Sequence, residues 1–237
     1  MKRVITIILA AAMLFALAAC GTTNDPATSG STQSTNESTS ANNGTPDPDT
    51  VSETGQTTDE PGTGTKILVV YFSRTGEQYS VGTIDKGNTA IVAEMIAEKT
   101  GADLYEILPE TDYYPYTYKE LTDVAKKEQS EKARPKIKGE LPDVSKYDTI
   151  FIGAPVWWGD WPMIMYTFFE SVNLSGKKLV PFSTHEGSGL SGFDKKLASA
   201  APKATVLTGQ AFRGGDCQNK QADVRATVNK WIDGLGY

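Results

Sequence analysis

Three loops of this chain combine hydroxyl residues, aromatic rings and glycines in patterns that suit ligand binding. The first loop consists of Ser73, Arg74, Thr75 and Gly76 and, after an insertion at residues 77–87, Asn88 and Thr89. Hydroxyls and backbone N–H groups at the start of a helix bind phosphate without a cation. The loop has neither the lysine of a nucleotide P-loop nor a Gly-x-Gly-x-x-Gly fingerprint. The same residue types are common at helix caps and turns, so this loop alone leaves both interpretations open.

The second loop, residues 154–162, reads Ala-Pro-Val-Trp-Trp-Gly-Asp-Trp-Pro. A loop interrupted by proline and glycine is expected to be too exposed to bury all three indoles. Exposed indoles of this kind stack on planar ligands. The alternative is a hydrophobic plug over the end of a sheet.

The third loop, residues 183–191, reads Ser-Thr-His-Glu-Gly-Ser-Gly-Leu-Ser and contains His185, the only histidine of the chain. A single histidine without neighbouring cysteines or histidines is a poor metal site. The chain has no Gly-x-Ser-x-Gly elbow of the kind that hydrolases use. The polar, glycine-rich composition therefore indicates a flexible ligand loop.

Each loop follows a predicted strand. Residues 67–72 form an uninterrupted apolar run, which is typical of a central strand buried on both faces. Further strands are predicted at 102–108, 149–153, 178–184 and 204–207, and helices at 88–100, 117–133, 162–172, 192–200 and 218–235, with Asn88 as the N-cap of the first helix. This alternation predicts an α/β fold with a doubly wound, five-stranded parallel sheet. In such sheets ligands bind at the carboxyl ends of the strands.

The N-terminal part differs from this domain. Residues 1–20 have a basic start and an apolar run that ends in Leu-Ala-Ala-Cys20, which resembles a bacterial lipoprotein signal with cleavage and lipidation at Cys20. An ordinary signal peptide is the alternative. Residues 21–65 carry seven acids and no Lys or Arg, and their polar composition predicts a disordered tether. Residues 66–237 carry 21 basic and 22 acidic residues, so we expect a nearly neutral domain that binds no nucleic acid.

Taken together, the three loops resemble the FMN-binding loops of the flavodoxin superfamily, in particular its bacterial flavodoxin-like group. The matching motifs are Tyr-Phe-Ser-Arg-Thr-Gly at 71–76, Pro-x-Trp-Trp-Gly at 155–159 and Pro-Phe-x-Thr-x-x-Gly-Ser-Gly at 181–189. The resemblance extends from residue 66 to the C-terminus. It implies a strand order of 2-1-3-4-5 with helices on both faces, and it implies an FMN site.

The resemblance also implies roles for individual residues. Around the FMN phosphate it places Ser73, Thr75, Asn88 and Thr89; along the flavin ring Pro155, Val156, Trp157, Trp158 and Gly159; and at the flavin edge Thr184, His185, Glu186, Gly187, Ser188 and Gly189. Arg74 and Gly76 complete the first loop. A histidine that only structures its own loop is the alternative for His185. Asp160 and Glu186 are candidates for lowering the flavin potential, and Asp160→Asn is expected to raise it.

The insertion at residues 77–87 departs from the family pattern, in which Thr-Gly is followed directly by Asn-Thr. Glycines lie close to both of its ends, and it contains Tyr79. The hypothesis is a flap near the flavin phosphate or near a partner face.

These observations predict an extracytoplasmic FMN flavoprotein in electron transfer, anchored by lipid on the outer face of the bacterial cytoplasmic membrane. It would act as a flavodoxin-type carrier for a redox protein or as a reductase of small acceptors such as quinones. The chain has no nicotinamide-binding fingerprint, which favours the carrier, and no flavinyl-threonine pattern, so FMN would be noncovalent. The alternative is a flavin-free surface protein whose aromatic cleft binds a glycan or a protein partner.

Overall fold

A computed structural model describes residues 65–237. The predicted signal peptide, the lipidation site at Cys20 and nearly all of the predicted tether lie outside the described residues. From residue 65 to residue 237, no helix is both long enough and apolar enough to cross a membrane.

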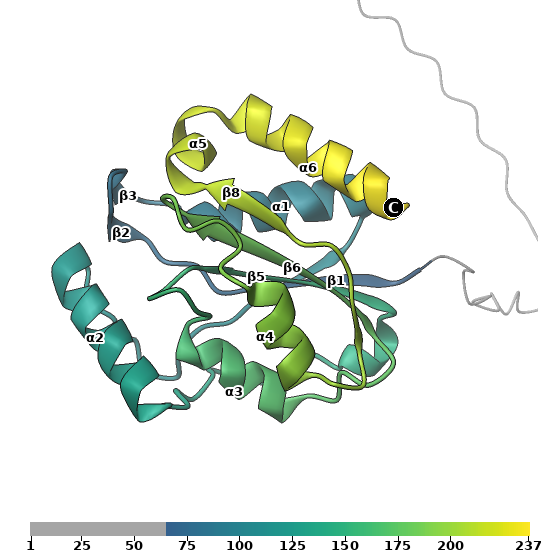
Figure 1. The fold of residues 1–237 in the computed structure, drawn as a ribbon, viewed down its shortest axis with the longest axis horizontal. Coiled ribbons are helices and arrows are strands. Elements are labelled where there is room, and N and C mark those ends of the chain that lie inside the picture. The colour runs from purple at the N-terminus through teal and green to yellow at the C-terminus, as the bar shows by residue number, and fades with distance from the viewer. Residues whose placement is uncertain (1–64) are drawn as a thin grey trace, which may run out of the picture. The chain divides into compact units, whose positions relative to one another are not determined.

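The centre of the fold is a parallel sheet (Figure 1). Its main strands are β1 (Ile67–Tyr71), β4 (Asp103–Glu106), β5 (Thr149–Pro155), β6 (Lys178–His185) and β7 (Thr205–Val206). They lie in the order β4-β1-β5-β6-β7, which confirms the predicted order 2-1-3-4-5. In the register, Val69 is opposite Phe151, and Phe151 is opposite Val180. After β1 the chain crosses to β4 on one side of β1, and it later returns to the other side of β1 as β5. The connections that follow β1 and β5 therefore lead in opposite directions along the sheet, which makes the gap between these two strands the topological switch point.

The predicted fifth strand is interrupted. Only Thr205–Val206 of the predicted segment pairs with the start of β6, and the chain then forms β8 (Gln210–Arg213), which pairs with the second half of β6. A Cβ atom on Gly209 would lie 2.6 Å from the carbonyl oxygen of Pro181. Glycine therefore allows a close approach to β6 between the two short strands.

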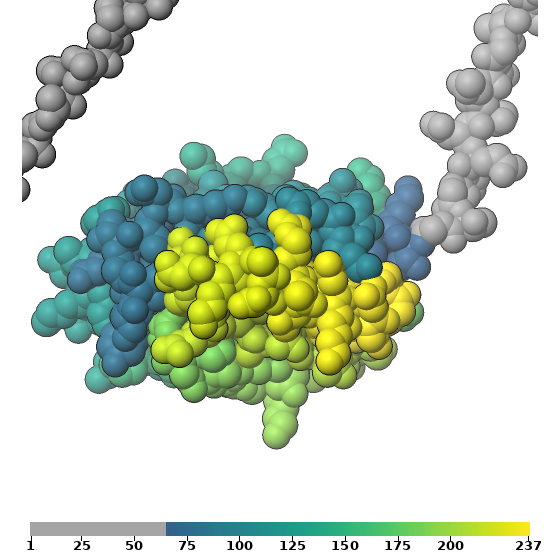
Figure 2. All heavy atoms as spheres, turned by 90° about the horizontal axis from the view of Figure 1, so that it is seen from above, coloured from purple at the N-terminus to yellow at the C-terminus, as the bar shows by residue number. Residues whose placement is uncertain are grey.

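Helices cover both faces of the sheet, as predicted (Figure 1). On one face lie α1 (Asn88–Thr100), α5 (Gly214–Asn219) and α6 (Gln221–Leu235), and on the other face α3 (Met163–Ser171) and α4 (Phe193–Ala200). Figure 2 looks onto the first face, where the yellow C-terminal helices lie against the blue N-terminal part of the domain. The closing helix predicted at 218–235 is two helices in the structure, α5 and α6. The first of them, α5, begins four residues before the predicted start.

The apolar run of β1 explains why two cores form. Successive side chains of a strand point to opposite faces. Leu68, Val70 and Phe72 belong to the core under α3 and α4, whereas Ile67, Val69 and Tyr71 belong to the core under α1 and α6. All of these side chains are buried.

Two further elements lie outside these layers, beside the carboxyl ends of the strands (Figure 1). The helix α2 (Tyr118–Glu131) buries only Leu121, Ala125 and Glu128. Residues of the insertion form an antiparallel hairpin, β2 (Gly76–Gln78) and β3 (Gly82–Ile84). A short 3-10 turn, Val144–Lys146, precedes β5.

The hairpin is fixed to the start of α2. The backbone N–H of Glu77 donates to the carbonyl of Tyr116 (2.9 Å), and the N–H of Tyr118 donates to the Glu77 carboxylate (2.8 Å). The first N–H groups of a helix have no partner within the helix, and a carboxylate there also interacts favourably with the helix dipole. The hairpin and α2 therefore form one connected rim.

Candidate functional site

A cleft of about 290 Å³ lies at the carboxyl edge of the sheet. Its sheet-side wall comes from the loops after β1, β5 and β6 and from the start of α1. The predicted site residues on this wall are Ser73, Arg74, Asn88, Thr89, Pro155, Val156, Trp157, Trp158, Thr184, His185, Glu186 and Ser188. Segments that are far apart in the sequence therefore meet in one cleft.

Five predicted site residues do not line the cleft, namely Thr75, Gly76, Gly159, Gly187 and Gly189. Thr75 is exposed to solvent. The four glycines all have positive φ angles, so they shape the turns of the loops. Gly76 is the clearest case, because a Cβ atom there would lie 2.8 Å from the carbonyl oxygen of Tyr116.

The start of α1 differs from the prediction by one residue. Gly87 is the N-cap, and Asn88 is the first residue of the helix. The hydroxyl of Ser73 takes the place of a capping side chain, since its Oγ accepts a hydrogen bond from the N–H of Ala90 (3.1 Å). The Asn88 side-chain oxygen instead accepts from the amide of Gln218 (2.7 Å). The first loop is therefore attached directly to the N-terminus of α1.

A buried hydrogen bond connects the first loop to the third. The hydroxyls of Thr89 and Thr184 lie 2.8 Å apart, and the two residues are 1% and 3% exposed. This bond fixes the distance between α1 and the end of β6. It gives the cleft a rigid floor.

Arg74 lines the cleft, and two of its three guanidinium nitrogens have partners elsewhere, whereas its buried Nε has no hydrogen-bond partner within the described residues. Nη1 pairs with Asp112 (3.0 Å), Nη2 donates to the carbonyl of Tyr114 (2.8 Å), and the group lies over the Tyr114 ring at 5.4 Å. Arg74 therefore holds residues 112–114 against the first loop. A phosphate in this cleft would depend on hydroxyls and N–H groups, as the sequence predicts.

The three tryptophans of the second loop have different environments. The ring of Trp157 contacts Phe72 and Tyr114 in edge-to-face geometry at 5.4 and 5.3 Å. Trp158 is 51% exposed and lines the cleft. Trp161 is only 1% exposed and stacks on Phe193 at 3.6 Å, so it belongs to the core. The loop thus lines the cleft at its start and fills the core at its end.

His185 structures its own loop while also lining the cleft. Its Nδ1 accepts a hydrogen bond from the N–H of Gly187 (2.8 Å). Partial burial lowers the pKa of His185, so the ring is neutral near pH 7, with its proton on Nε2. The ring therefore brings no positive charge to the cleft near pH 7.

The two acids predicted to tune a flavin differ in position. Glu186 lines the cleft, and its carboxylate accepts from the N–H of Gly215 (2.6 Å) and from Nε of Arg213 (2.9 Å). Asp160 does not line the cleft. Its carboxylate accepts from the Tyr166 hydroxyl (3.0 Å) and lies 3.4 Å from Nζ of Lys196.

On the opposite wall of the cleft, the flap hypothesis for residues 77–87 covers only the hairpin part, and no prediction placed α2 there. We call this wall the helix-side wall; it consists of Gln78, Tyr79 and Val81 from the hairpin and Tyr118, Leu121, Thr122 and Ala125 from α2. The spacing 118, 121, 122, 125 is one face of a helix. That sparse apolar stripe on an otherwise charged helix was the only available signal, and it does not reveal where the helix packs.

A buried carboxylate anchors this wall. Glu128 of α2 is 6% exposed and accepts hydrogen bonds from the hydroxyls of Tyr113 and Tyr114 (3.2 Å for Tyr114). Burial raises the pKa of Glu128 above its ordinary value of 4.5, and the two hydroxyls partly counteract this.

This arrangement makes stability depend on pH. A carboxyl whose folded-state pKa is raised contributes stability that is complete below its unfolded pKa and is lost as the pH rises through the folded-state pKa. The contribution of Glu128 to the free energy of unfolding should therefore fall as the pH rises above about 4.5, and Glu128→Gln should remove this contribution from the slope. Denaturant titrations from pH 4.5 to pH 7.5 measure both slopes. The raised pKa of Glu106 and the lowered pKa of His185, which acts with the opposite sign, are shared by both proteins and cancel in the comparison. Equal slopes would contradict the assignment to Glu128.

The fold is that of a doubly wound α/β protein with a cleft at the topological switch point of its sheet, where such folds bind ligands. The flavodoxin family model matches residues 66–234, and the chain therefore belongs to the flavodoxin family. Among solved structures, a protein of Bacteroides uniformis designated a flavoprotein is 32% identical, with 72% of this chain and 99% of that chain covered and a TM-score of 0.58. A flavoprotein from Lactobacillus acidophilus, solved in complex with FMN, is 23% identical, with 67% and 99% coverage and a TM-score of 0.52. Curated proteins give no significant match.

Proposed function

We propose that this protein binds FMN noncovalently and transfers electrons, and that a lipid on Cys20 tethers it to the outer face of the cytoplasmic membrane. In this proposal the protein supplies the binding site and sets the potential, while the redox chemistry is that of the flavin. Its partner is a redox protein or a small-molecule electron acceptor.

The observation that carries the proposal is the meeting of three loops in one cleft. Hydroxyls at the N-terminus of α1 suit a phosphate, indoles suit a planar ring, and the third loop closes the site beside them. Membership of the flavodoxin family supports the same ligand. A flavin-free glycan binder would have no use for the phosphate-binding half of this arrangement.

The test is a visible spectrum of residues 66–237 with and without added FMN. Both core clusters lie within this part, and the B. uniformis chain corresponds to it over 99% of its length, so it is a self-contained fold. We expect a yellow protein and quenching of FMN fluorescence on binding. A colourless protein that leaves FMN fluorescence unchanged would refute FMN binding and leave the fold intact.

The tether is tested separately in cells. The full chain should fractionate with membranes, and a Cys20→Ser variant should be released from them. If the variant stays with the membrane fraction, Cys20 is not the anchor.

Glu186→Gln should raise the reduction potential of the bound flavin. The change removes a negative charge from the cleft and leaves the Arg213 cation without its partner, and both effects favour the more negative, reduced flavin. Potentiometric titration of the FMN-loaded protein measures the shift. Asp160→Asn should produce a smaller rise, because Asp160 lies off the cleft beside Lys196. A fall in potential for Glu186→Gln, or a larger shift for Asp160→Asn, would contradict this assignment.

A further inference from the structure

Two tight turns, one in the second loop and one at the end of the third, have matching φ angles. The second-loop turn runs from Trp157 to Asp160, and the N–H of Asp160 donates to the carbonyl of Trp157 (2.9 Å). The third-loop turn runs from Leu190 to Phe193, and the N–H of Phe193 donates to the carbonyl of Leu190 (3.0 Å). In both turns the two central residues have positive φ angles, 50° and then 71°, as in a type I′ turn.

The first central residue of each turn is not a glycine. It is Trp158 in the second-loop turn and Ser191 in the third-loop turn, and Gly159 and Gly192 follow them. Trp158 and Ser191 are two of the four non-glycine residues with positive φ within residues 65–237. Such residues are strained, and the strain persists only where surrounding contacts hold the backbone. The contacts of the two turns therefore decide the shape of both loops.

One ammonium group lies between the two turns. Nζ of Lys196 donates to the carbonyl of Gly159 in the second-loop turn and to the carbonyl of Ser191 in the third-loop turn (3.0 Å). The same Nζ lies 3.4 Å from the carboxylate of Asp160. A lysine ammonium has three N–H donors, so these three oxygens match its capacity. Lys196 itself does not line the cleft.

The lysine and its carboxylate partner are both anchored. Lys196 belongs to α4, a helix that buries Phe193 and Leu197. The Asp160 carboxylate accepts a hydrogen bond from the Tyr166 hydroxyl of α3 (3.0 Å). The ammonium therefore reaches the two turns from a fixed position, and less side-chain freedom is lost in holding them.

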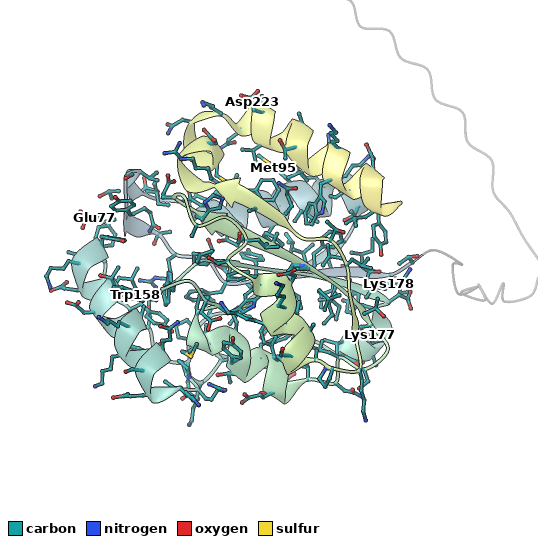
Figure 3. All side chains as sticks on the ribbon, in the orientation of Figure 1. Glu77, Met95, Trp158, Lys177, Lys178 and Asp223 are labelled. Atoms are coloured by element: carbon teal, nitrogen blue, oxygen red, sulfur yellow. The ribbon has the colours of Figure 1, made fainter. Side chains whose placement is uncertain are left out.

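The second-loop turn is also held from its other side. The indole N–H of Trp158 donates to the carbonyl of Thr122 (2.9 Å), and the Gln129 amide donates to the carbonyl of Trp158 (3.3 Å). Figure 3 shows Trp158 between α2 and the end of the sheet. These contacts reach the second-loop turn alone. Within the described residues, Lys196 is the side chain whose hydrogen bonds join it to the third-loop turn.

A half-exposed lysine–aspartate pair alone would contribute little to the protein. The two backbone carbonyls make this lysine different. Within residues 65–237, Lys196 supplies the hydrogen bond that each of them accepts. Removal of the ammonium would leave both carbonyls to water and would free two strained turns at once.

We propose that Lys196 is a positioning residue for the flavin. It acts by setting the distance between the second loop, whose indoles suit a planar ring, and the third loop, which closes the site beside them. Binding sites lose affinity when their supporting groups shift by about half an ångström. The consequence for FMN rests on the proposed function, whereas the holding of the two turns can be measured without FMN.

The experiment compares residues 66–237 with their Lys196→Met variant, in which an unbranched side chain of similar length lacks the ammonium. Amide hydrogen exchange of the flavin-free proteins is measured first. The N–H groups of Asp160 and Phe193 close the two turns and should exchange about tenfold or more faster in the variant. The N–H of Phe151, in the central strand β5, reports global unfolding and should change by less than about threefold.

Fluorescence titration of the same proteins with FMN follows. Lys196→Met should weaken FMN binding by about tenfold or more. Lys195→Met is the matched control, because Lys195 is the exposed neighbour on α4 and its ammonium makes no hydrogen bond or ion pair with the residues that the structure describes. That control should change exchange and FMN affinity by less than about twofold.

Restoring an ammonium should restore both properties. A Lys196→Cys variant treated with 2-bromoethylamine gains an aminoethyl thioether of the same length as lysine. Its exchange and FMN affinity should return to within about threefold of the parent. Cys217, the only native cysteine of residues 66–237, is fully buried, and burial raises its pKa to about 12. The folded parent therefore serves as the control for alkylation elsewhere.

Unchanged exchange at the two turns, an equal increase at Phe151, or failure of the rescue would overturn the inference. Equal FMN binding by the parent and Lys196→Met would also overturn it, and would leave the proposed function intact. A parent that takes up no FMN would refute the proposed function. The expected exchange pattern with its rescue would then still support Lys196 as the residue that positions the two loops.

Discussion

Gly87→Ala should weaken FMN binding by about tenfold or more, because ligand-site geometry tolerates shifts of only about half an ångström. A Cβ atom at this position would lie 2.1 Å from Oγ of Ser73 and 2.7 Å from the carbonyl oxygen of Arg74. The φ angle of Gly87 is −65°, which alanine adopts freely. The effect is therefore steric: the first loop must move away from the N-terminus of α1, and the hydroxyl of Ser73 moves with it.

The same crowding should lower the free energy of unfolding by about 1–3 kcal/mol, the usual cost of overpacking. FMN fluorescence titration and urea denaturation measure the two effects. Gly234→Ala is the matched control, since a Cβ atom there meets nothing within 4 Å. That change in the α6 helix should leave FMN affinity unchanged and increase stability by about 0.5–1 kcal/mol. Unchanged FMN affinity in Gly87→Ala would show that the first loop does not hold the ligand.

Trp161→Ala should destabilise the fold by about 3–5 kcal/mol, as is usual when a large buried aromatic is truncated. The ring is fully enclosed, stacks on Phe193 at 3.6 Å and meets Phe169 edge-on at 5.5 Å. Its buried Nε1 has no hydrogen-bond partner within the described residues, so the loss comes from packing. Chemical denaturation of the flavin-free protein is the appropriate measurement.

Trp158→Gly, in the same loop, gives the contrast. Its indole is half exposed, and glycine relieves the left-handed backbone strain, so stability should change by no more than about 1 kcal/mol. Similar losses in the two variants would mean that the loop is a single hydrophobic plug.

The central strands and the sheet-side wall could be predicted because local sequence determines them. The apolar run of β1 is long enough to indicate burial on both faces. Ser73 and Trp157 follow a strand closely, and Thr184 lies in the last two residues of β6. In a parallel sheet the carboxyl ends of strands share one edge, so residues near those ends must gather there. This reasoning does not depend on side-chain detail.

The part of the helix-side wall that comes from α2 could not be predicted, because tertiary contacts position it, and the insertion could be given only as a flap near the site, without its hairpin. The helix α2 reads as charged and helical, and no pattern within it shows that Leu121 and Ala125 face a cleft rather than the sheet. The hairpin strands have three residues each, too few for an alternation to be read. Sequence alone did not say which of the tryptophans is buried, because neighbouring tryptophans in one short loop look alike, although Trp161 is the one that stacks on Phe193.

The direction of β1 has a practical consequence for attaching this domain to surfaces. β1 starts at Ile67 and runs toward the cleft, so the preceding chain joins the domain at the opposite edge of the sheet (Figure 1). Tyr237 lies at that same edge, where its hydroxyl is 2.7 Å from that of Thr149 at the start of β5. An electrode or a fused protein joined directly at either point is therefore attached at the edge opposite the cleft, whose mouth stays open to whatever arrives from solution.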